Sequence, residues 1–187
     1  MSVDGVNRMV QTGSKAADVN LPKTVSASYT DGSRRDLSVA WDAITDDQLA
    51  SDSEFAVSGT VIGALAGTKA TIGVRSDAQS QTAGAAQPIE QTVYQNSKSV
   101  ALPSVVPVRF PNGMLDDRTV MWDEASVAGV KLDTIGDYEV SGTAEGSSSQ
   151  AKITVHVVAD PNGGADPDPE PTPGSQAGAR YSVDWLD

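Results

Sequence analysis

The chain repeats itself once, with an offset of 81 residues, and this internal repeat constrains its fold more than any other feature. Four pieces recur in the same order: Leu21-Pro22 as Leu102-Pro103, Asp31-Gly32 as Asn112-Gly113, Trp41-Asp42 as Trp122-Asp123, and Ala70-Thr71-Ile72-Gly73-Val74 as Ala151-Lys152-Ile153-Thr154-Val155. A fixed offset of this kind indicates two copies of one structural unit. The length of 187 residues allows one domain or two, and the repeat favours two.

Both copies consist of short runs in which apolar and polar residues alternate, which predicts β-strands throughout. Alternate residues share one face of a strand, so the apolar members should form the core of each copy. The core residues predicted in this way are Trp41, Val39, Phe55, Val57 and Ile72 in the first copy, and Trp122, Val120, Tyr138, Val140 and Ile153 in the second. We therefore expect an all-β chain.

Composition predicts where the domains begin and end. Residues 1–76 and 89–159 should form the two strand-rich domains. The stretch 77–88 between them is small and polar, which predicts a flexible linker or a long surface loop. Residues 160–175 are rich in Pro, Asp and Glu and should form a semi-rigid extended linker. Residues 176–187 are expected to be a tail or the start of a truncated further domain.

Charge and composition exclude several classes of function. The formal net charge is −12, so the phosphate neutralisation on which nucleic-acid binding depends is not expected. No stretch approaches the roughly 20 apolar residues that cross a bilayer, so we expect no membrane insertion. The chain contains no cysteine, which excludes structural disulfides, thiolate catalysis and zinc–sulfur sites. We also expect the chain to begin after any secretion leader.

The ordered pieces resemble the bacterial immunoglobulin-like domains of the group 4 type, and the resemblance covers nearly all of residues 10–158. It implies two tandem immunoglobulin-like β-sandwiches of seven strands each. It also implies a non-catalytic accessory role in secreted or cell-surface bacterial proteins, often glycoside hydrolases and adhesins. The matching pieces are Leu21-Pro22, Asp31-Gly32, Val39-Ala40-Trp41-Asp42, Phe55-Ala56-Val57-Ser58-Gly59-Thr60 and Ile72-Gly73-Val74, then Leu102-Pro103, Asn112-Gly113, Val120-Met121-Trp122-Asp123, Tyr138-Glu139-Val140-Ser141-Gly142-Thr143 and Ile153-Thr154-Val155.

The second copy departs from the first at positions where a contact of its own is to be sought. Pro107 stands where the first copy has Ser26, and it must face an unpaired edge or a bulge because proline lacks a ladder donor. Arg118 stands where the first copy has Leu37. Tyr138 follows a loop with two extra residues, and its context predicts a tyrosine corner, in which the phenol bonds to upstream backbone.

The aromatic and glycine positions within the strands have both structural and binding interpretations. Trp41 and Trp122 could stack on sugar rings, but the alternation assigns both to the apolar face, as expected for the buried tryptophan of an immunoglobulin-type sandwich. Gly59 and Gly142 lie inside predicted strands, where glycine usually marks a bulge or a close approach of the backbone.

No pattern of catalytic residues emerges from the sequence. His156, the single histidine, should face outward and has no serine or cysteine nucleophile pattern beside it. The serine-rich run 146–149 is interpreted as a hairpin loop. The loop acids do not follow a known calcium-ligand rhythm, so we expect solvated carboxylates and no metal site. These acids are Asp46-Asp47, Asp52, Glu54, Asp116-Asp117 and Asp123-Glu124.

Three functions are compatible with these observations. The first is a non-catalytic tandem spacer that positions a neighbouring domain of a large secreted or cell-surface bacterial protein, with a glycoside hydrolase as the parent. The second is a carbohydrate-binding module, which would bring polysaccharide as a partner. The third is a pair of stalk repeats from an adhesin. In each case we expect no cofactor, a monomer, an extracellular or cell-surface location, and neighbouring domains of the same polypeptide as partners.

Overall fold

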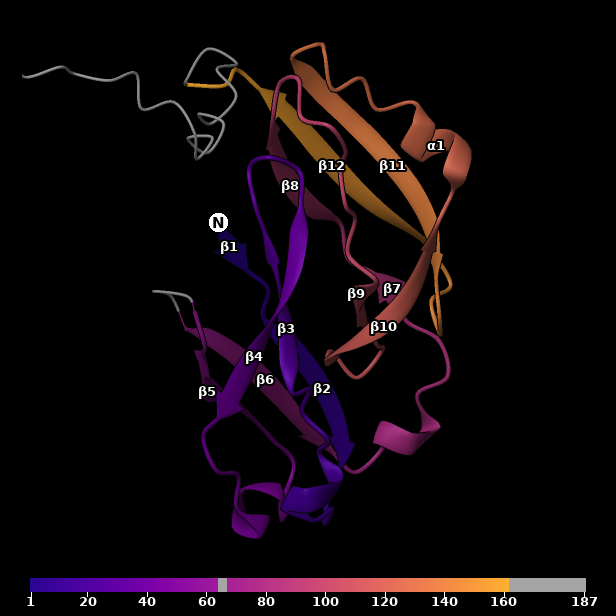
Figure 1. Ribbon diagram of the computed structural model, residues 1–187. Coiled ribbons are helices and arrows are strands. Elements are labelled where there is room, and N and C mark those ends of the chain that lie inside the picture. Colours follow the sequence, from indigo (N-terminus) through magenta and orange to yellow (C-terminus); the bar gives the residue numbers. More distant parts are fainter. Residues whose placement is uncertain (64–66, 162–187) are drawn as a thin grey trace, which may run out of the picture.

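The computed structural model describes residues 1–63 and 67–161, which form two β-modules lying side by side (Figure 1). We call residues 1–76 the first module and residues 84–161 the second module. The tandem all-β fold is therefore confirmed. Residues 162–187, which include almost all of the predicted Pro-rich linker and the whole predicted tail, lie outside the described residues.

The two modules have the same strand topology. Each module contains six strands, and neighbouring strands in the following orders are hydrogen-bonded. The order is β1-β3-β4-β5-β6-β2 in the first module and β7-β9-β10-β11-β12-β8 in the second. The first module contains β1 (Ser2–Val3), β2 (Val6–Gln11), β3 (Thr24–Ser28), β4 (Arg34–Trp41), β5 (Ser53–Val61) and β6 (Thr68–Arg75). The second contains β7 (Ala85–Ala86), β8 (Ile89–Tyr94), β9 (Val105–Arg109), β10 (Leu115–Trp122), β11 (Gly136–Ala144) and β12 (Gln150–Val158).

Short helical turns occupy some of the connections. These are the 3₁₀ turns Ala16–Asp18, Asp46–Leu49 and Ala78–Ser80, and the helix α1 (Glu124–Ala128). The turn Asp46–Leu49 and helix α1 follow the Trp-Asp pair of their respective modules, where the second copy has its two extra residues. Asp123 caps α1 by accepting a hydrogen bond from the Ser126 N–H at 3.0 Å.

One long strand in each module belongs to both layers of the sandwich. The first part of β4, up to Ser38, pairs with β3, and its last part, from Val39 to Trp41, pairs with β5. The strand β10 divides in the same way between β9 and β11. The resemblance implied seven strands per module. The described residues form six in each, and in each one strand pairs along different parts of its length with two neighbours.

The predicted core residues lie inside the modules to different degrees. Val57, Ile72, Val120, Val140 and Ile153 are buried, and Trp41, Trp122, Val39, Phe55 and Tyr138 are half-buried. Leu49 is fully buried as well, although it comes from a 3₁₀ turn that strand alternation could not reveal. The core of the first module thus draws on its loops as well as its strands.

The repeated tryptophan, proline and glycine form one structural element in each module. The indole N–H of Trp41 donates to the carbonyl of Pro22 at 2.7 Å, and that of Trp122 donates to Pro103 at 2.8 Å. Each ring lies over a glycine on the neighbouring strand. A Cβ on Gly59 or Gly142 would come within 2.7 Å or 2.8 Å of the indole Cε3. The glycines therefore mark a close approach, as expected, and the tryptophans are committed to internal contacts.

The stretch 77–88 is more ordered than a flexible linker or free surface loop. It holds a 3₁₀ turn and the strand β7, which pairs with β9. Gly84 exchanges backbone hydrogen bonds with the serine-rich loop, donating to Gly146 and accepting from Ser148, both at 2.8 Å. A Cβ on Gly84 would lie 2.6 Å from the Arg109 carbonyl. The small side chains that suggested flexibility instead permit close packing.

Tyr138 behaves as its sequence context predicts, but Pro107 does not face the unpaired edge or bulge that was expected. The Pro107 carbonyl accepts from the Gln87 N–H at 2.8 Å, so the side to which its missing donor would point lies just beyond the last β7 pair, Ala86 with Val108. The Tyr138 hydroxyl donates to the Thr134 carbonyl at 3.0 Å, which confirms the tyrosine corner. The first module has Phe55 at the equivalent place and cannot form this bond.

Candidate functional site

The most elaborate polar arrangement in the described residues lies at the joint between the two modules. Two hairpins build this joint (Figure 1). The hairpin of β9 and β10 reaches from the second module to β2, and the hairpin of β3 and β4 reaches from the first module to the end of β8. We therefore treat the joint as the candidate functional site.

The strand β2 is the edge of its sheet, and two carboxylates from β10 satisfy its outward donors. The backbone N–H of Asn7 donates to Asp117 Oδ2 at 2.8 Å, and the Asn7 side chain donates to Asp117 Oδ1 at 2.9 Å. The backbone N–H of Met9 donates to Asp116 Oδ1 at 3.3 Å. We call this contact of Asp116 and Asp117 with β2 the carboxylate clamp. It covers an edge that would otherwise be open to strand pairing.

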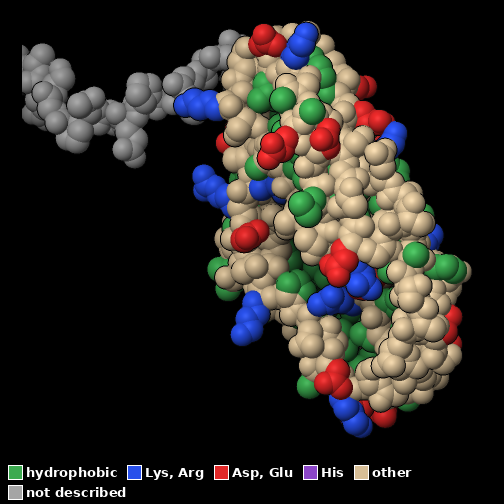
Figure 2. Space-filling model, turned by 90° about the vertical axis from the view of Figure 1, so that its right-hand side faces the viewer, with side chains coloured by type: hydrophobic (Ala, Val, Ile, Leu, Met, Phe, Trp, Pro, Cys, Tyr) green, Lys and Arg blue, Asp and Glu red, His purple; other side chains and the backbone are tan. Residues whose placement is uncertain are grey.

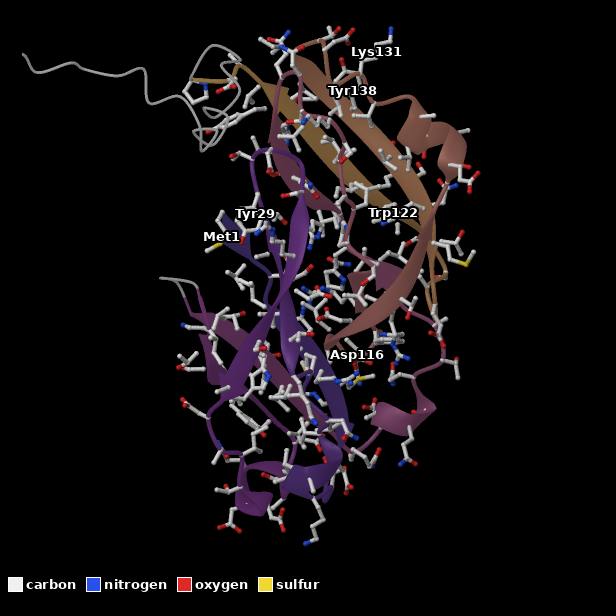
Figure 3. The ribbon with its side chains drawn as sticks, in the orientation of Figure 1. Met1, Tyr29, Asp116, Trp122, Lys131 and Tyr138 are labelled. Atoms are coloured by element: carbon white, nitrogen blue, oxygen red, sulfur yellow. The ribbon has the colours of Figure 1, made fainter. Side chains whose placement is uncertain are left out.

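Charge is balanced only in part within the clamp. Asp116 forms an ion pair with Arg118 at 2.9 Å, and Arg8 lies 4.0 Å from the same carboxylate. Burial raises the pKa of Asp116, although the charge of Arg118 opposes the change. Burial also raises the pKa of Asp117, against the hydrogen bonds from Asn7. Two neighbouring carboxylates are thus held in a partly desolvated place between the modules, and Figure 3 shows Asp116 on β10 near the joint.

Apolar contacts accompany the clamp. Met9 of β2 packs against the second module's core cluster around Val106, Val108 and Phe110. In the opposite direction, the Met114 side chain lies on Gly73 of β6, where a Cβ would come within 2.4 Å of its sulfur. The position equivalent to Gly73 in the second module is Thr154. A glycine in the first copy therefore accommodates a methionine from the second.

The tip of the β3–β4 hairpin forms the other half of the joint. The Thr30 carbonyl accepts from the Tyr94 N–H at 2.6 Å, and the Gly32 carbonyl accepts from the Ala101 N–H at 2.8 Å. Gly32 has a φ of +81°, and a Cβ there would lie 2.0 Å from the Ser99 carbonyl. Both the backbone conformation and the close approach require glycine at this position.

A buried polar network connects this hairpin to β8. The Arg34 side chain, 10% exposed, donates to Asp4 and to Ser28 Oγ, and it lies 3.4 Å from Gln91 Oε1. The Gln91 side chain is buried and donates to the Ala101 carbonyl at 3.2 Å. Burial raises the pKa of Asp4, while the charge of Arg34 acts against this change. The network links three segments of the chain that belong to different modules.

A cleft of about 830 Å³ lies between the modules beside these contacts. Its walls come from both modules and combine polar with apolar side chains. They include Asp4, Tyr29, Arg34, Gln91 and Asp117. On the outer face drawn in Figure 2, charged side chains of both signs are scattered and hydrophobic ones form only small groups.

The single histidine lies on β12 beside two acidic side chains. His156 is half-buried on the sheet surface, with Nδ1 2.7 Å from Asp137 Oδ1 and Nε2 3.9 Å from Glu90 Oε2. The described residues contain no group of three or more His, Cys, Asp or Glu that could hold a metal ion. Across that same part of the chain, no helix is long and apolar enough to span a membrane.

The acids differ from the solvated carboxylates expected from sequence, most clearly at the clamp. Asp116 is buried and Asp117 is half-buried, and both lie on a strand rather than in a loop. Several other acids brace loops: Asp46 accepts from the Ala16 N–H at 2.8 Å, and Asp52 accepts from the Ser76 N–H at 2.9 Å. The prediction was wrong for the clamp because sequence alone does not show which strand faces another module. The one sequence feature that pointed to this region was Arg118, which stands where the first copy has Leu37.

One comparison with known families bears on the identity of these modules. The family model described as bacterial Ig-like domain (group 4) matches residues 3–64 and residues 86–147. The two matched stretches fall on the two modules. The first match begins at the second residue of β1 and the second at the second residue of β7.

Proposed function

The chain belongs to the bacterial Ig-like domain (group 4) family, whose members are non-catalytic accessory modules, and we propose that it acts as a rigid tandem spacer. In this role it positions a neighbouring domain within a large secreted or cell-surface bacterial protein. Bacterial Ig-like domains are often found in such proteins. The observation that carries the proposal is the joint, which holds the two modules in one orientation.

The joint has the features expected of a fixed connection. It uses two separate contacts, the carboxylate clamp at β2 and the hairpin contact at Tyr94 and Ala101. Two separated contacts resist rotation about either one. Several of its buried polar groups are paired, as in the network of Arg34, Asp4 and Gln91, although Arg118 Nε in the clamp has no hydrogen-bond partner among the described residues. Removing one member would leave another unsatisfied, which makes partial opening costly.

A glycoside hydrolase is the parent protein that we propose for this spacer. The proposal follows from the family resemblance and from the Pro- and acid-rich stretch 160–175, whose composition suits an interdomain linker. The coding sequence beyond Asp187 tests it. A catalytic domain of that class supports the proposal, whereas further copies of the repeat would favour an adhesin stalk.

Carbohydrate binding is a second candidate because of the cleft between the modules. Tyr29, Arg34, Gln91 and Asp117 line the cleft, and such residue types contact sugar rings and hydroxyls, although the Arg35 guanidinium lies 5.5 Å from the centroid of the Tyr29 ring. Affinity electrophoresis against soluble polysaccharides tests this candidate, with Tyr29→Ala as the variant. Retardation that Tyr29→Ala abolishes would support it, and no retardation on any polymer would eliminate it.

Rigidity can be measured directly because the chain contains no native cysteine. Spin labels on Ala43→Cys and Ala128→Cys, both at exposed positions in different modules, report the distance between the modules. We expect a single narrow distance distribution by pulsed electron paramagnetic resonance. A broad distribution in the otherwise unchanged chain would refute the rigid spacer.

A further inference from the structure

The turn at Asn112-Gly113 holds a side-chain amide at the joint that the spacer role does not use. Asn112 Nδ2 donates to Asp77 Oδ1 at 2.9 Å and lies 3.3 Å from the Met9 sulfur. Its Oδ1 accepts from the Met114 N–H at 3.1 Å, which closes the turn locally. The amide therefore connects the tip of the β9–β10 hairpin to β2 and to the segment that follows the first module.

An asparagine that precedes a glycine can react with its own backbone. The backbone nitrogen of the glycine attacks the side-chain carbonyl carbon, the amide nitrogen leaves as ammonia with the proton of the glycine N–H, and a succinimide ring forms. Water then opens the ring at one carbonyl or the other, which gives an aspartate or an isoaspartate. Glycine favours the attack because it has no Cβ beside the nitrogen and its backbone moves freely. The reaction needs water and no other reagent.

Two features single out Asn112 as a place for this reaction. Asparagine precedes glycine twice in the chain, at Asn112 and at Asn162, and of these only Asn112 lies within the described residues. Gly113 is exposed, and a Cβ on it would meet no heavy atom within 4 Å, so the turn has room for the ring and access for water. The equivalent Gly32 is covered, because a Cβ there would lie 2.0 Å from the Ser99 carbonyl oxygen. The open turn is thus the one that carries asparagine.

We propose that Asn112 is a site of spontaneous deamidation whose conversion loosens the joint. This inference goes beyond the spacer role, because it gives the joint an irreversible chemical change as the protein ages. The aspartate product loses the donor to Asp77 and places a second carboxylate where that hydrogen bond now lies. Two carboxylates at this distance repel each other. Among the described residues, no lysine or arginine hydrogen-bonds to the Asn112 side chain to offset the new charge.

The hairpin itself tolerates an aspartate, so the cost of that product falls on the contacts across the joint. The equivalent residue of the first module is Asp31, and its Oδ1 accepts from the Ser33 N–H at 2.9 Å, as the amide oxygen does in the second module. The isoaspartate product instead adds a main-chain carbon between β9 and β10, just before Met114, which lies on Gly73 of β6. Both products thus disturb the joint, one through charge and the other through position.

The first measurement follows conversion in the whole folded chain at mildly alkaline pH, where the attacking nitrogen loses its proton more readily. Peptide mapping by mass spectrometry should show the amide-to-acid gain of mass in the peptide that contains Asn112, and an isoaspartate methyltransferase assay detects the second product. Asp31→Asn is the matched variant, because it places an asparagine before the covered Gly32. Conversion there should be slower by about tenfold or more, since the Ser99 carbonyl blocks the backbone movement that ring closure requires.

The second measurement asks whether conversion loosens the joint. Asn112→Asp mimics the aspartate product, and hydrogen exchange of the Asn7 and Met9 amides reports on the joint because both amides donate to the carboxylate clamp. We expect these amides to exchange about tenfold faster in Asn112→Asp. Adding Asp77→Asn should restore slow exchange, because the introduced amide can donate to the introduced carboxylate. Asp31→Asn alone should leave the exchange of both amides unchanged.

Three results would overturn the inference. They are an Asn112 that stays unconverted in the folded chain, equal conversion at the two turns of Asp31→Asn, and unchanged exchange of the clamp amides in Asn112→Asp. Circular dichroism of each variant checks that its modules stay folded. The spin-label distance of the unconverted chain is a separate measurement, so a joint that is flexible from the start and an amide that does not react give distinguishable results.

Discussion

The turns at Gly32 and Gly113 have nearly the same local structure and very different surroundings. Their φ angles are +81° and +85°, and both glycine N–H groups close the turn onto the aromatic residue three positions earlier. Gly32 lies against Ser99 of the other module, whereas a Cβ on Gly113 would meet no atom within 4 Å. Residues that both copies share therefore determine the local structure of each module. The joint depends on which residues of the other module lie nearby, and these differ between the two turns.

The same division separates the tryptophan elements from the clamp. The tryptophan, proline and glycine contacts occur at equivalent places in both modules. The clamp occurs once, because its residues Asp116 and Asn7 have no like residue at the equivalent positions. Substitutions at shared positions should therefore affect one module's folding, and substitutions at unshared positions should affect the joint.

Trp122→Ala is expected to have the largest effect, about 3–5 kcal/mol of unfolding free energy, as for large truncations in cores. It removes the indole from Gly142 and the hydrogen bond to Pro103. Denaturant unfolding measures the loss, with Met121→Ala at a neighbouring exposed position as the control. An unchanged unfolding midpoint in Trp122→Ala would disprove the structural role of this residue.

Gly32→Ala is expected to cause the next largest loss of unfolding free energy. Gly113→Ala is its matched control, and the difference between the two losses measures the contact at the joint. Both substitutions place alanine at positive φ, which costs about 1–2 kcal/mol. Gly32→Ala also drives a methyl group into the Ser99 carbonyl, so its total cost should be about 3 kcal/mol. Thermal unfolding of the two variants gives the comparison. Equal losses would show that the hairpin tip contributes nothing at the joint.

The pH dependence of stability should distinguish the joint from the loops. Burial raises the pKa of Asp4, Asp116 and Asp117 above 3.8, so the folded chain binds their protons more tightly than the unfolded chain. Their contribution is fully present below 3.8 and is lost as the pH rises through the folded pKa values. Hydrogen bonds from Ser33 lower the pKa of Asp31, whose contribution is present above 3.8 and lost as the pH falls through its folded pKa.

Stability should therefore increase as the pH falls from neutral toward about 4 and decrease below that. The double variant Asp116→Asn and Asp117→Asn should show a smaller increase in unfolding free energy as the pH falls from neutral toward about 4. In Asp36→Asn this increase should be the same as in the unaltered chain. Unfolding free energies measured across this range test both statements. A stability that falls steadily from neutral pH downward would show that the clamp gains more from charge than it loses by burial.

Tyr138→Phe should have the smallest effect, about 0.5–1 kcal/mol, since it removes one partly exposed hydrogen bond to Thr134 and leaves the ring. The first module has Phe55 at this position, so the change makes the two modules alike. The measurement is the unfolding midpoint, with Phe55→Tyr as the reciprocal variant. A loss as large as that of Trp122→Ala would mean that the tyrosine corner organises the whole module.

The sequence is sufficient to predict the modules but not how they meet. The alternation of apolar and polar residues correctly places Val57, Ile72, Val140 and Ile153 on the buried face. It does so because every second residue of a strand in a two-layer fold faces the core. Joint residues such as Gly32 show no period, since their partners lie in another module. In the sequence, Asp116 and Asp117 look like solvated acids. Only the approach of β2 makes Asp116 a buried acceptor and Asp117 a half-buried one.

The first and last long strands of each module pair in parallel, and this pairing determines how the module resists a pull along the chain. In the first module, β2 is the first long strand, after the two-residue β1, and β6 is the last. In the second module, β8 and β12 have the same relation, with the two-residue β7 before β8. A pull along the chain therefore draws the two strands of each pair in opposite directions along their length. The evenly spaced bonds between parallel strands then share the load together, rather than opening one at a time. Tension along the chain is thus borne in shear by the hydrogen bonds of this strand pair in each module.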